Sequence, residues 1–145
     1  MIALLQRVSG ASVAVDGIPV GEIGPGLLVF AAVERRDTVR DAKRLAERIF
    51  GYRVFPDRAG RMNQSLADTD GDLLLVPQFT LAADTRKGTR ASFTGAAPPA
   101  AGEELFKQLV SACLDRSGRV ATGRFGAHMR VSLVNDGPVT FWLES

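Results

Sequence analysis

The sequence predicts one α+β domain over residues 1–145, in which a largely antiparallel or mixed β-sheet carries two main helices. Two observations support this fold class. Short apolar segments bounded by glycine, proline and aspartate are typical of strands, and they outnumber the two segments with apolar residues at helical spacing. The chain, with 46% apolar and 23% charged residues, is also long enough to fold around its own hydrophobic core.

The N-terminal part is predicted to be rich in strands, which lie at residues 2–8, 11–15, 18–23 and 27–33. Asp16-Gly17 is typical of a tight turn between the second and third of these strands. The unbroken apolar run of the fourth strand predicts that it is buried on both faces of the sheet.

The first predicted helix begins after Asp37 or Thr38, either of which can cap it, and it ends at Gly51. Its apolar residues recur at helical spacing: Val39, Ala42, Leu45, Ala46, Ile49 and Phe50. This periodicity predicts a helix with one buried side.

The middle of the chain is predicted to contain a strand at 52–55, a turn at 57–60, a long extended stretch at 72–83 and a loop at 84–98. Pro77-Gln78 interrupts the extended stretch. Because proline has no N–H for a sheet ladder, we expect the strand to lie at an edge or to be broken there.

The second predicted helix begins at Pro98-Pro99 and ends near Gly118. One buried stripe runs along it: Phe106, Leu109, Val110 and Cys113. Cys113 is therefore expected in the core and not at a reactive site. Strands at 129–135 and 139–143 follow, joined by a bend at 136–138.

The formal charge is +2, and fifteen of the eighteen basic residues are arginine. The basic residues gather in three segments: 34–61, 84–90 and 115–130. Such segregation fits either a phosphate-binding face or ordinary solvated surface, and charge alone favours the second interpretation. No apolar run approaches the ~20 residues that span a bilayer. Without a signal-peptide pattern or a paired cysteine, we expect a cytoplasmic protein with no membrane partner.

The sequence offers few side chains for acid–base or nucleophilic chemistry, because it has one histidine and one cysteine. His128 has no cluster of metal ligands around it, so we expect it at the surface or behind the residues of a site, and not as a metal ligand. Asp68, Asp70 and Asp72 lack the glycine and glutamate of a calcium loop and indicate a solvated acidic turn. Phosphate-loop, dinucleotide-binding and nucleophile-elbow motifs are missing as well. We therefore expect neither a metal nor a cofactor.

Two segments are unusual for structure alone. In residues 75–83 a proline and an amide interrupt an apolar strand, which is typical either of backbone amides that face a ligand or of an irregular edge. In residues 133–142, Gly137-Pro138 lies between two strands. That pair indicates either a held cis peptide or a simple turn, and the residues themselves leave both alternatives open.

At these two segments the chain resembles the D-aminoacyl-tRNA deacylases, cytoplasmic enzymes that hydrolyse D-amino acids from mischarged tRNA. The resemblance covers essentially the full length and is carried by residues 1–8, 51–55, 78–82, 122–125 and 135–140. The Gln-Phe-Thr-Leu and Asn-Asp-Gly-Pro motifs, in this order and at this separation, are specific. The resemblance implies a barrel-like form of the predicted α+β fold.

The resemblance also implies a homodimer with active sites at the interface, in which Gly137-Pro138 reaches into the pocket of the partner. There its carbonyl groups leave no room for an L side chain, so L-amino acids are rejected while D-amino acids and glycine are accepted. The expected substrates are therefore tRNAs that carry a D-amino acid or glycine, including mischarged glycyl-tRNA(Ala). Arg7 matches an arginine that supports the motif.

Gln78, Phe79 and Thr80 match the catalytic segment of the family. The implied chemistry is assisted by the 2′-hydroxyl of the terminal ribose, with backbone N–H groups near Phe79 and Thr80 stabilising the oxyanion. Phe125 and Met129 match the pocket for the terminal adenosine.

If the substrate is a tRNA, part of the arginine-rich surface is expected to contact its phosphate groups. Arg86, Lys87 and Arg90 become candidates for tRNA phosphate contacts, as does the segment 116–130. The basic residues between Arg40 and Arg48 are expected to be solvated surface. Weak, salt-sensitive binding is predicted.

The chain departs from the family pattern at Pro77, where serine is usual, and at Ala91, where proline is usual. Three hypotheses follow. The leading one is a D-aminoacyl-tRNA and glycyl-tRNA deacylase with retained activity. The alternatives are a catalytically impaired module that binds the tRNA acceptor end, suggested by Pro77, and a protein-based esterase that uses Thr80 as nucleophile.

Overall fold

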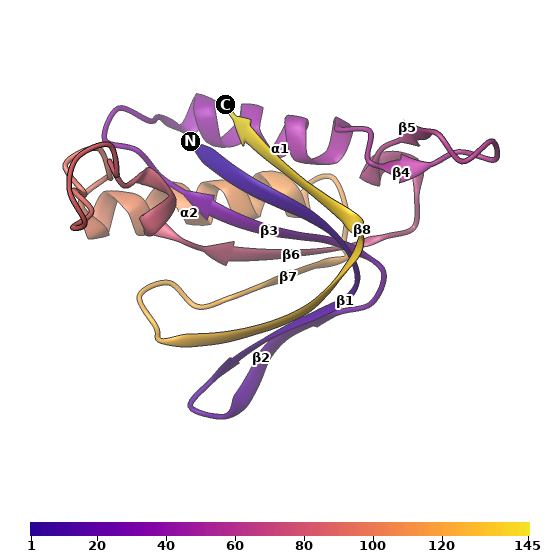
Figure 1. Cartoon of the computed structure of the whole chain (residues 1–145), viewed down its shortest axis with the longest axis horizontal. Helices are drawn as coiled ribbons and strands as arrows, with labels where there is room; N and C mark the ends of the chain where they lie inside the picture. Colours follow the sequence, from indigo (N-terminus) through magenta and orange to yellow (C-terminus); the bar gives the residue numbers. More distant parts are fainter.

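The computed structural model describes residues 1–145 and has two α-helices against a bent six-stranded sheet (Figure 1). The sheet strands are β1 (Ile2–Val15), β2 (Ile18–Ile23), β3 (Gly26–Ala32), β6 (Asp72–Pro77), β7 (Val120–Thr122) and β8 (Met129–Glu144). The helices are α1 (Val39–Gly51) and α2 (Pro99–Leu114). The predicted fold class, a mixed sheet with two main helices, is confirmed.

The sheet combines parallel and antiparallel pairs. In the order β2-β1-β3-β6-β7, the pairs β3–β6 and β6–β7 are parallel, whereas β1 pairs antiparallel with β2, β3 and β8. As predicted, the strand that begins near Leu27 is buried on both faces. On one face Leu27, Val29 and Ala31 pack in the cluster beneath the helices, and on the other face Leu28 packs in a second cluster.

Strands β1 and β8 are each one long strand, although two were predicted for each. They pair along most of their length, with register shifts between Gln6 and Val8 and between Val8 and Gly10. Irregular pairing of this kind bends a strand while the ladder continues on both sides of it. Both strands turn sharply in Figure 1 for this reason. Beyond the bend, β2 and the adjoining parts of β1 and β8 fold back over the face of the sheet that the helices do not cover.

The bend creates two hydrophobic clusters on opposite faces of the sheet. Alternate residues of β6 show the division, because Leu73 and Leu75 pack towards the helices while Leu74 and Val76 pack on the other face. On that second face β2 folds back against β7. A Cβ atom at Gly21 would lie 2.8 Å from the carbonyl oxygen of Thr122, so a glycine is needed for this approach.

The two helices follow the sequence closely. Thr38 caps α1 in a reciprocal arrangement with Asp41, and the buried residues of this helix are Ala42, Leu45, Ala46, Ile49 and Phe50. Helix α2 begins at Pro99 as expected but ends at Leu114, short of the predicted end at Gly118. Cys113 is fully buried, which confirms its predicted place in the core.

The strand predicted at 52–55 is wrong. Only Phe55 and Pro56 pair, as β4 (Phe55–Pro56), with β5 (Met62–Gln64). Tyr52 instead packs edge-on against the ring of Phe141, with 5.3 Å between the ring centroids. Tyr52 is therefore used for packing, and the ladder is confined to the end of the predicted strand.

The extended stretch predicted over 72–83 is also wrong in its second half. Strand β6 ends at Pro77, and the chain continues as the 3₁₀ helix η2 (Phe79–Ala82). The break at Pro77 was predicted, because proline cannot donate to a ladder. The second 3₁₀ helix, η1 (Leu66–Asp68), together with β5 and β7, was not predicted.

The predicted acidic turn contains structural carboxylates. Asp68 accepts hydrogen bonds from the backbone and hydroxyl groups of Ser65, at 2.9 and 2.6 Å, which lowers the pKa of this carboxyl group. Asp72 accepts from the N–H of Gly24 at 3.1 Å. These two carboxylates therefore cap and join backbone segments.

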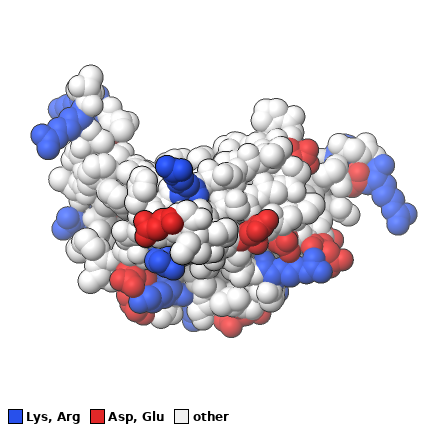
Figure 2. Space-filling view, turned by 90° about the horizontal axis from the view of Figure 1, so that it is seen from below, with Lys and Arg blue, Asp and Glu red and all other residues white.

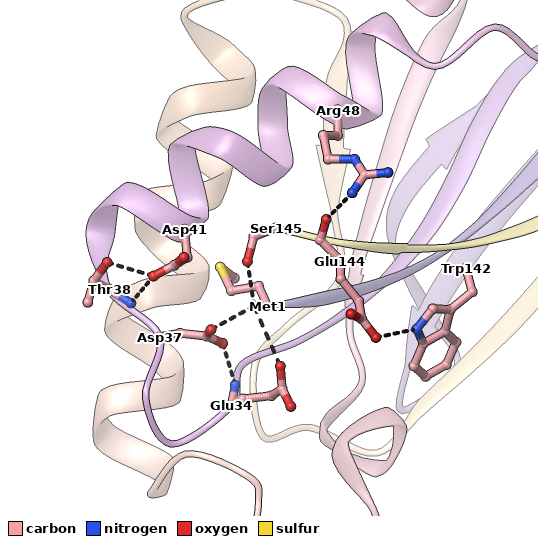
Figure 3. A network of polar contacts seen from close by, with 9 residues as sticks. All are labelled: Met1, Glu34, Asp37, Thr38, Asp41, Arg48, Trp142, Glu144 and Ser145. Carbon is pink, nitrogen blue, oxygen red and sulfur yellow. Dashed lines mark hydrogen bonds and ion pairs between the residues drawn. The ribbon is translucent and has the colours of Figure 1, made fainter.

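The two ends of the chain lie side by side against α1 (Figures 1 and 3). The α-ammonium group of Met1 donates to Asp37 at 2.6 Å and to the hydroxyl of Ser145 at 2.8 Å. Arg48 of α1 donates to the backbone carbonyl of Glu144. These contacts tie the ends of β1 and β8 to the helix. Neither α1 nor α2 has the length and apolar character that a membrane-spanning helix requires.

Candidate functional site

A pocket of about 420 Å³ opens between the end of β6, the first turns of α2 and the segment that joins β7 to β8. Four of the predicted site residues line it: Gln78, Phe79, Phe125 and Met129. Most of the other lining side chains are apolar. The pocket therefore offers surface for packing and few groups for proton transfer.

Gln78 lies at the junction between β6 and η2. Its backbone N–H donates to the carbonyl of Ala31 at 2.8 Å, which continues the β3–β6 ladder by one residue. Its side-chain amide donates to the hydroxyl oxygen of Thr80. An amide N–H cannot accept the proton of that hydroxyl, so this contact orients Thr80 without activating it as a nucleophile.

Phe79 and Thr80 begin the 3₁₀ helix η2, in which the N–H of Leu81 makes the first hydrogen bond, to the carbonyl of Gln78 at 3.2 Å. The N–H groups of Phe79 and Thr80 precede that bond and are left without a partner in the helix. The ring of Phe79 is 58% exposed and packs against Phe93, with 5.0 Å between centroids. This places two backbone donors beside an aromatic wall of the pocket.

Phe125 and Met129 form the opposite side of the pocket. The Phe125 ring packs against Phe106 of α2, with 6.3 Å between the centroids. The Met129 sulfur accepts a hydrogen bond from the backbone N–H of Arg124 at 3.3 Å. The structure thus holds both side chains from behind and leaves their other faces towards the pocket.

Pro77 lines the same pocket. Along β6 the backbone N–H groups point alternately towards β3 and towards β7. The N–H of Leu73 donates to the carbonyl of Arg119, next to β7. The nitrogen of Pro77, four residues later, therefore faces the β7 side as well. Strand β7 ends at Thr122, and the pairing of β6 with it ends at Leu75. Proline at this position therefore interrupts no ladder bond.

Gly137 and Pro138 lie in the middle of β8, exposed and joined by a cis peptide bond. Arg7 holds the residue before them, since its Nε donates to the carbonyl of Asp136 at 2.8 Å. Its Nη1 also donates to the carbonyl of Val54 at 2.6 Å. The guanidinium group thus connects this segment to the chain beyond α1.

Asn135 holds the motif from the other side, and sequence reasoning assigned it no separate role. Its side-chain oxygen accepts from the N–H of Val139 at 2.7 Å, and its amide donates to the carbonyl of the same residue at 3.2 Å. The two bonds close the chain around Gly137-Pro138. An amide placed just before a Gly-Pro pair is the signal that could have shown this.

The structure does not bring Gly137-Pro138 to the pocket of the same chain. Neither residue lines that pocket, nor does Arg7 or Thr80. Gly137 lies eight positions after Met129 in β8, which is roughly 25 Å along an extended strand. The predicted site residues therefore form two separate groups.

The predicted phosphate contacts lie in the loop between η2 and α2. Arg86 is paired with Asp84 at 2.7 Å, and this pairing holds the pKa of the Asp84 carboxyl group well below its ordinary value. Lys87 and Arg90 are exposed and in no ion pair. On the face drawn in Figure 2, basic side chains are separated by acidic and uncharged atoms, with no continuous basic area.

His128 is exposed, as predicted, and also lines the pocket, which was not predicted. It is the only ionisable side chain among the residues that do so. Pro99, Gly102 and Phe106 complete the wall formed by α2. The sequence assigned Pro99 and Phe106 to structure alone and gave Gly102 no role. Their position next to the pocket depends on how α2 crosses the sheet, for which the sequence holds no local signal.

The fold and the site define an α+β protein with an apolar binding pocket and no pair of acid–base side chains within it. Residues 4–144 match the family model described as D-Tyr-tRNA(Tyr) deacylase. The D-aminoacyl-tRNA deacylase of Thioalkalivibrio sulfidiphilus is 69% identical over 99% of this chain and 97% of that protein. That of Xanthomonas campestris is 64% identical over 99% of both chains. The chain belongs to the D-Tyr-tRNA(Tyr) deacylase family.

Two solved structures share the fold. One, described as a c-Myc DNA unwinding element binding protein, has a TM-score of 0.95 and 35% sequence identity, and the match covers 100% of this chain and 99% of that one. The other, described as a probable eukaryotic D-amino acid tRNA deacylase, has a TM-score of 0.87 over 99% and 98% of the two chains. Its 18% identity supports the likeness of fold alone.

Proposed function

We propose that the protein is a hydrolase that cleaves the ester bond between a D-amino acid and the 3′ end of tRNA, and that it also accepts glycyl-tRNA, including mischarged glycyl-tRNA(Ala). The observation that carries the proposal is the apolar pocket, which gathers Gln78, Phe79, Phe125 and Met129 in a chain with a full-length family match. We expect it to act in the cytoplasm, without a cofactor.

The hydrolysis needs an electrophilic carbonyl carbon and a water molecule, and the products are the free amino acid and the free ribose hydroxyl. The N–H groups of Phe79 and Thr80 are the proposed donors to the oxyanion that forms when water adds. One such donor is worth about 3 kcal/mol in other enzymes. His128 is the only ionisable side chain that lines the pocket, and the other lining residues offer no base, which is consistent with assistance by the 2′-hydroxyl of the substrate.

The terminal adenosine is proposed to lie between Phe125 and Met129. Stacking of a base on an aromatic ring is worth about 1–3 kcal/mol and needs an apolar, concave surface. The Phe125 ring has its back against Phe106, so it is already in place before the nucleoside binds. Outside the pocket, Arg86, Lys87 and Arg90 are the proposed contacts to tRNA phosphates.

Chiral selection is assigned to Gly137-Pro138, supplied by a second copy of the chain. Two features support this assignment. The motif is exposed and far from the pocket of its own chain, and β8 is an edge strand with exposed apolar side chains on Leu133, Val134 and Trp142. An exposed edge with apolar side chains is typical of a surface that pairs with another chain.

The decisive experiment compares hydrolysis of D-tyrosyl-tRNA and L-tyrosyl-tRNA by the purified protein, with glycyl-tRNA(Ala) as a third substrate. We expect release of D-tyrosine and glycine and no release of L-tyrosine. Equal hydrolysis of the D and L esters would contradict selection by Gly137-Pro138. Tight binding of D-tyrosyl-tRNA without hydrolysis would instead identify a module that binds the acceptor end.

One protein variant and one modified substrate identify the group that activates the reaction. If Thr80 attacked the ester, Thr80→Ala would remove nearly all activity, whereas assistance by the substrate predicts substantial residual activity. The complementary substrate is D-tyrosyl-tRNA that ends in 2′-deoxyadenosine. Undiminished hydrolysis of that substrate would exclude a role for the ribose hydroxyl.

A further inference from the structure

We propose that Gly123 is a positioning residue, and that the absence of a side chain there holds Met129 in the wall of the pocket. Gly123 follows β7 and does not line the pocket itself. The proposal rests on the proposed function in one respect, because it takes the terminal nucleoside as the ligand of this wall.

Gly123 is enclosed by the end of β6 and the start of β8. Its N–H donates to the carbonyl of Leu75 at 2.8 Å, which fixes its backbone beside β6. A Cβ atom built on Gly123 would lie 2.8 Å from the Met129 sulfur, 3.3 Å from Cδ of Pro77 and 3.5 Å from Cγ1 of Val76. Even an alanine at this position therefore requires a neighbour to move.

Met129 is the neighbour that can move. Val76 is at an ordinary contact distance, and Pro77 is a closed ring at the end of a strand buried in the sheet. The Met129 side chain is unbranched and flexible. Its sulfur, however, accepts the hydrogen bond from the N–H of Arg124. Displacement would break that bond and move the sulfur and methyl group out of the wall, while the backbone stays in place.

Gly102 and Phe125 form a milder case of the same arrangement. A Cβ atom on Gly102 of α2 would lie 3.4 Å from Cζ of Phe125, which is near an ordinary contact. Gly51, at the end of α1, has no atom within 4 Å of its Cβ position. Gly123, Gly102 and Gly51 thus form a series in which the space for a Cβ atom increases stepwise.

The first experiment measures binding of a non-hydrolysable mimic of the substrate, 3′-deoxy-3′-(D-tyrosylamino)adenosine, to variants of the full-length protein. We expect Gly123→Ala to weaken binding roughly tenfold, Gly102→Ala about twofold and Gly51→Ala not at all. Unfolding temperatures are measured for each variant. Unchanged binding by Gly123→Ala at unchanged stability would overturn the proposal.

Double variants identify the neighbour that responds. If the Cβ atom acts by displacing Met129, Gly123→Ala should have no further effect on binding in a Met129→Ala background, within about twofold. If it acts on Pro77, the effect should instead disappear in a Pro77→Ala background. That second result would overturn the assignment to Met129.

A third measurement does not depend on the function. The sequence has three methionines, Met1, Met62 and Met129, so ¹³C-methyl labelling gives three resolved NMR signals. Gly123→Ala should shift the signal of Met129 and leave that of the distant Met62 in place. An unmoved Met129 signal overturns the inference, whereas failure of the wild type to hydrolyse D-tyrosyl-tRNA counts against the proposed function alone.

Discussion

The pocket region and the motif region are held in place by different interactions. The pocket region consists of the residues around Gln78, Phe125 and Met129, and its apolar side chains are kept in position mainly by packing against α2 and the sheet. The motif region consists of Gly137-Pro138 with Arg7 and Asn135, and it is exposed. There, hydrogen bonds to backbone carbonyl and N–H groups fix the chain.

This difference predicts how each region responds to substitution. Packing interactions are distributed over many neighbours, so one truncated side chain weakens a wall without removing it. In the motif region a single guanidinium group makes the hydrogen bonds, and substitution of that one residue leaves the accepting carbonyl groups without a donor. We therefore expect graded effects in the pocket region and abrupt effects in the motif region.

Gly137→Ala should produce the largest effect. Gly137 has φ +151°, and a Cβ atom would lie 2.6 Å from Cγ2 and 2.8 Å from the backbone N of Val139. The backbone cannot yield as a flexible side chain can, so the motif must move. A misplacement of about 1 Å in a positioning group can reduce the rate roughly a hundredfold. Hydrolysis of D-tyrosyl-tRNA under single-turnover conditions measures the loss.

The matched control is Gly60→Ala, which also has a positive φ, +77°, but no atom within 4 Å of its Cβ position. It should lower stability by only about 1 kcal/mol and leave the rate unchanged. Equal losses of activity in the two variants would show that the steric contact at Gly137 is unimportant.

Mixing variants tests whether the two regions meet between subunits. In a mixed dimer of Gly137→Ala and Phe125→Ala chains, one site combines an intact pocket with an intact motif. At D-tyrosyl-tRNA concentrations well below the KM, where each parent variant keeps about a tenth of the activity or less, an equal, randomly exchanged mixture should recover about one quarter of wild-type activity. No recovery, with exchange of subunits verified, would contradict a site built from two chains.

Arg7→Ala should have the next largest effect. The Arg7 side chain is only 13% exposed, and its removal leaves the carbonyl groups of Asp136 and Val54 without their donors. A hydrogen bond to a charged group is worth about 1.5–3 kcal/mol. We expect the free energy of unfolding to fall by about 2–3 kcal/mol in urea titrations, together with weaker discrimination between D- and L-tyrosyl-tRNA.

Arg7→Lys keeps the charge but has one ammonium group, whereas the carbonyl groups of Asp136 and Val54 are bound by two separate nitrogen atoms of the planar guanidinium group. It should restore part of the stability and little of the discrimination. If lysine restored both fully, charge and not geometry would be the contribution of Arg7.

The sequence predicted those features that depend on adjacent residues and failed where a distant part of the chain decides the structure. Local patterns predicted α1 with a cap at Asp37 or Thr38, of which the structure uses Thr38, and the break at Pro77, because each depends on a few adjacent residues. The strand expected at 52–55 failed since Tyr52 packs on Phe141, a residue far along the chain. Local propensity carries no information about such a partner.

The same limit applied to the candidate site. Phe125 and Met129 could be connected with a pocket only through family resemblance, and the wall formed by Gly102 and Phe106 was not predicted at all. The single bent strand β8 was expected as two strands, because Gly137-Pro138 is a strong local signal for a turn. Pairing with β1 on both sides of the motif outweighs that signal.

Phe125→Ala should have a moderate effect that is confined to binding. Loss of the ring removes one stacking surface, worth about 1–3 kcal/mol. The KM for D-tyrosyl-tRNA should rise roughly tenfold while kcat stays within about threefold, and the preference for D over L should be unchanged. Leu105→Ala, a half-buried residue of the same part of the fold, controls for lost packing. A change in D over L preference would show that the regions are not separable.

Cys113 provides the smallest effect, and it should appear only at alkaline pH. Burial raises the pKa of its thiol from 9.0 to about 12, so the folded protein keeps a proton that the unfolded chain releases. Stability linked to this thiol is fully present below pH 9.0 and is lost as the pH rises towards about 12. This loss of stability affects α2, which carries Gly102 and Phe106 of the pocket wall. The motif region contains no cysteine.

Cys113→Ala removes the titrating thiol and should cost about 1 kcal/mol of stability at neutral pH, where the two proteins differ only in packing. Between pH 9 and 11 the midpoint of urea unfolding should then fall less steeply in the variant than in the wild type. Other alkaline groups titrate in both proteins, so the difference between the two slopes isolates Cys113. Parallel slopes would mean that the thiol meets water in the folded protein, and that the helix behind the pocket opens more readily than its burial implies.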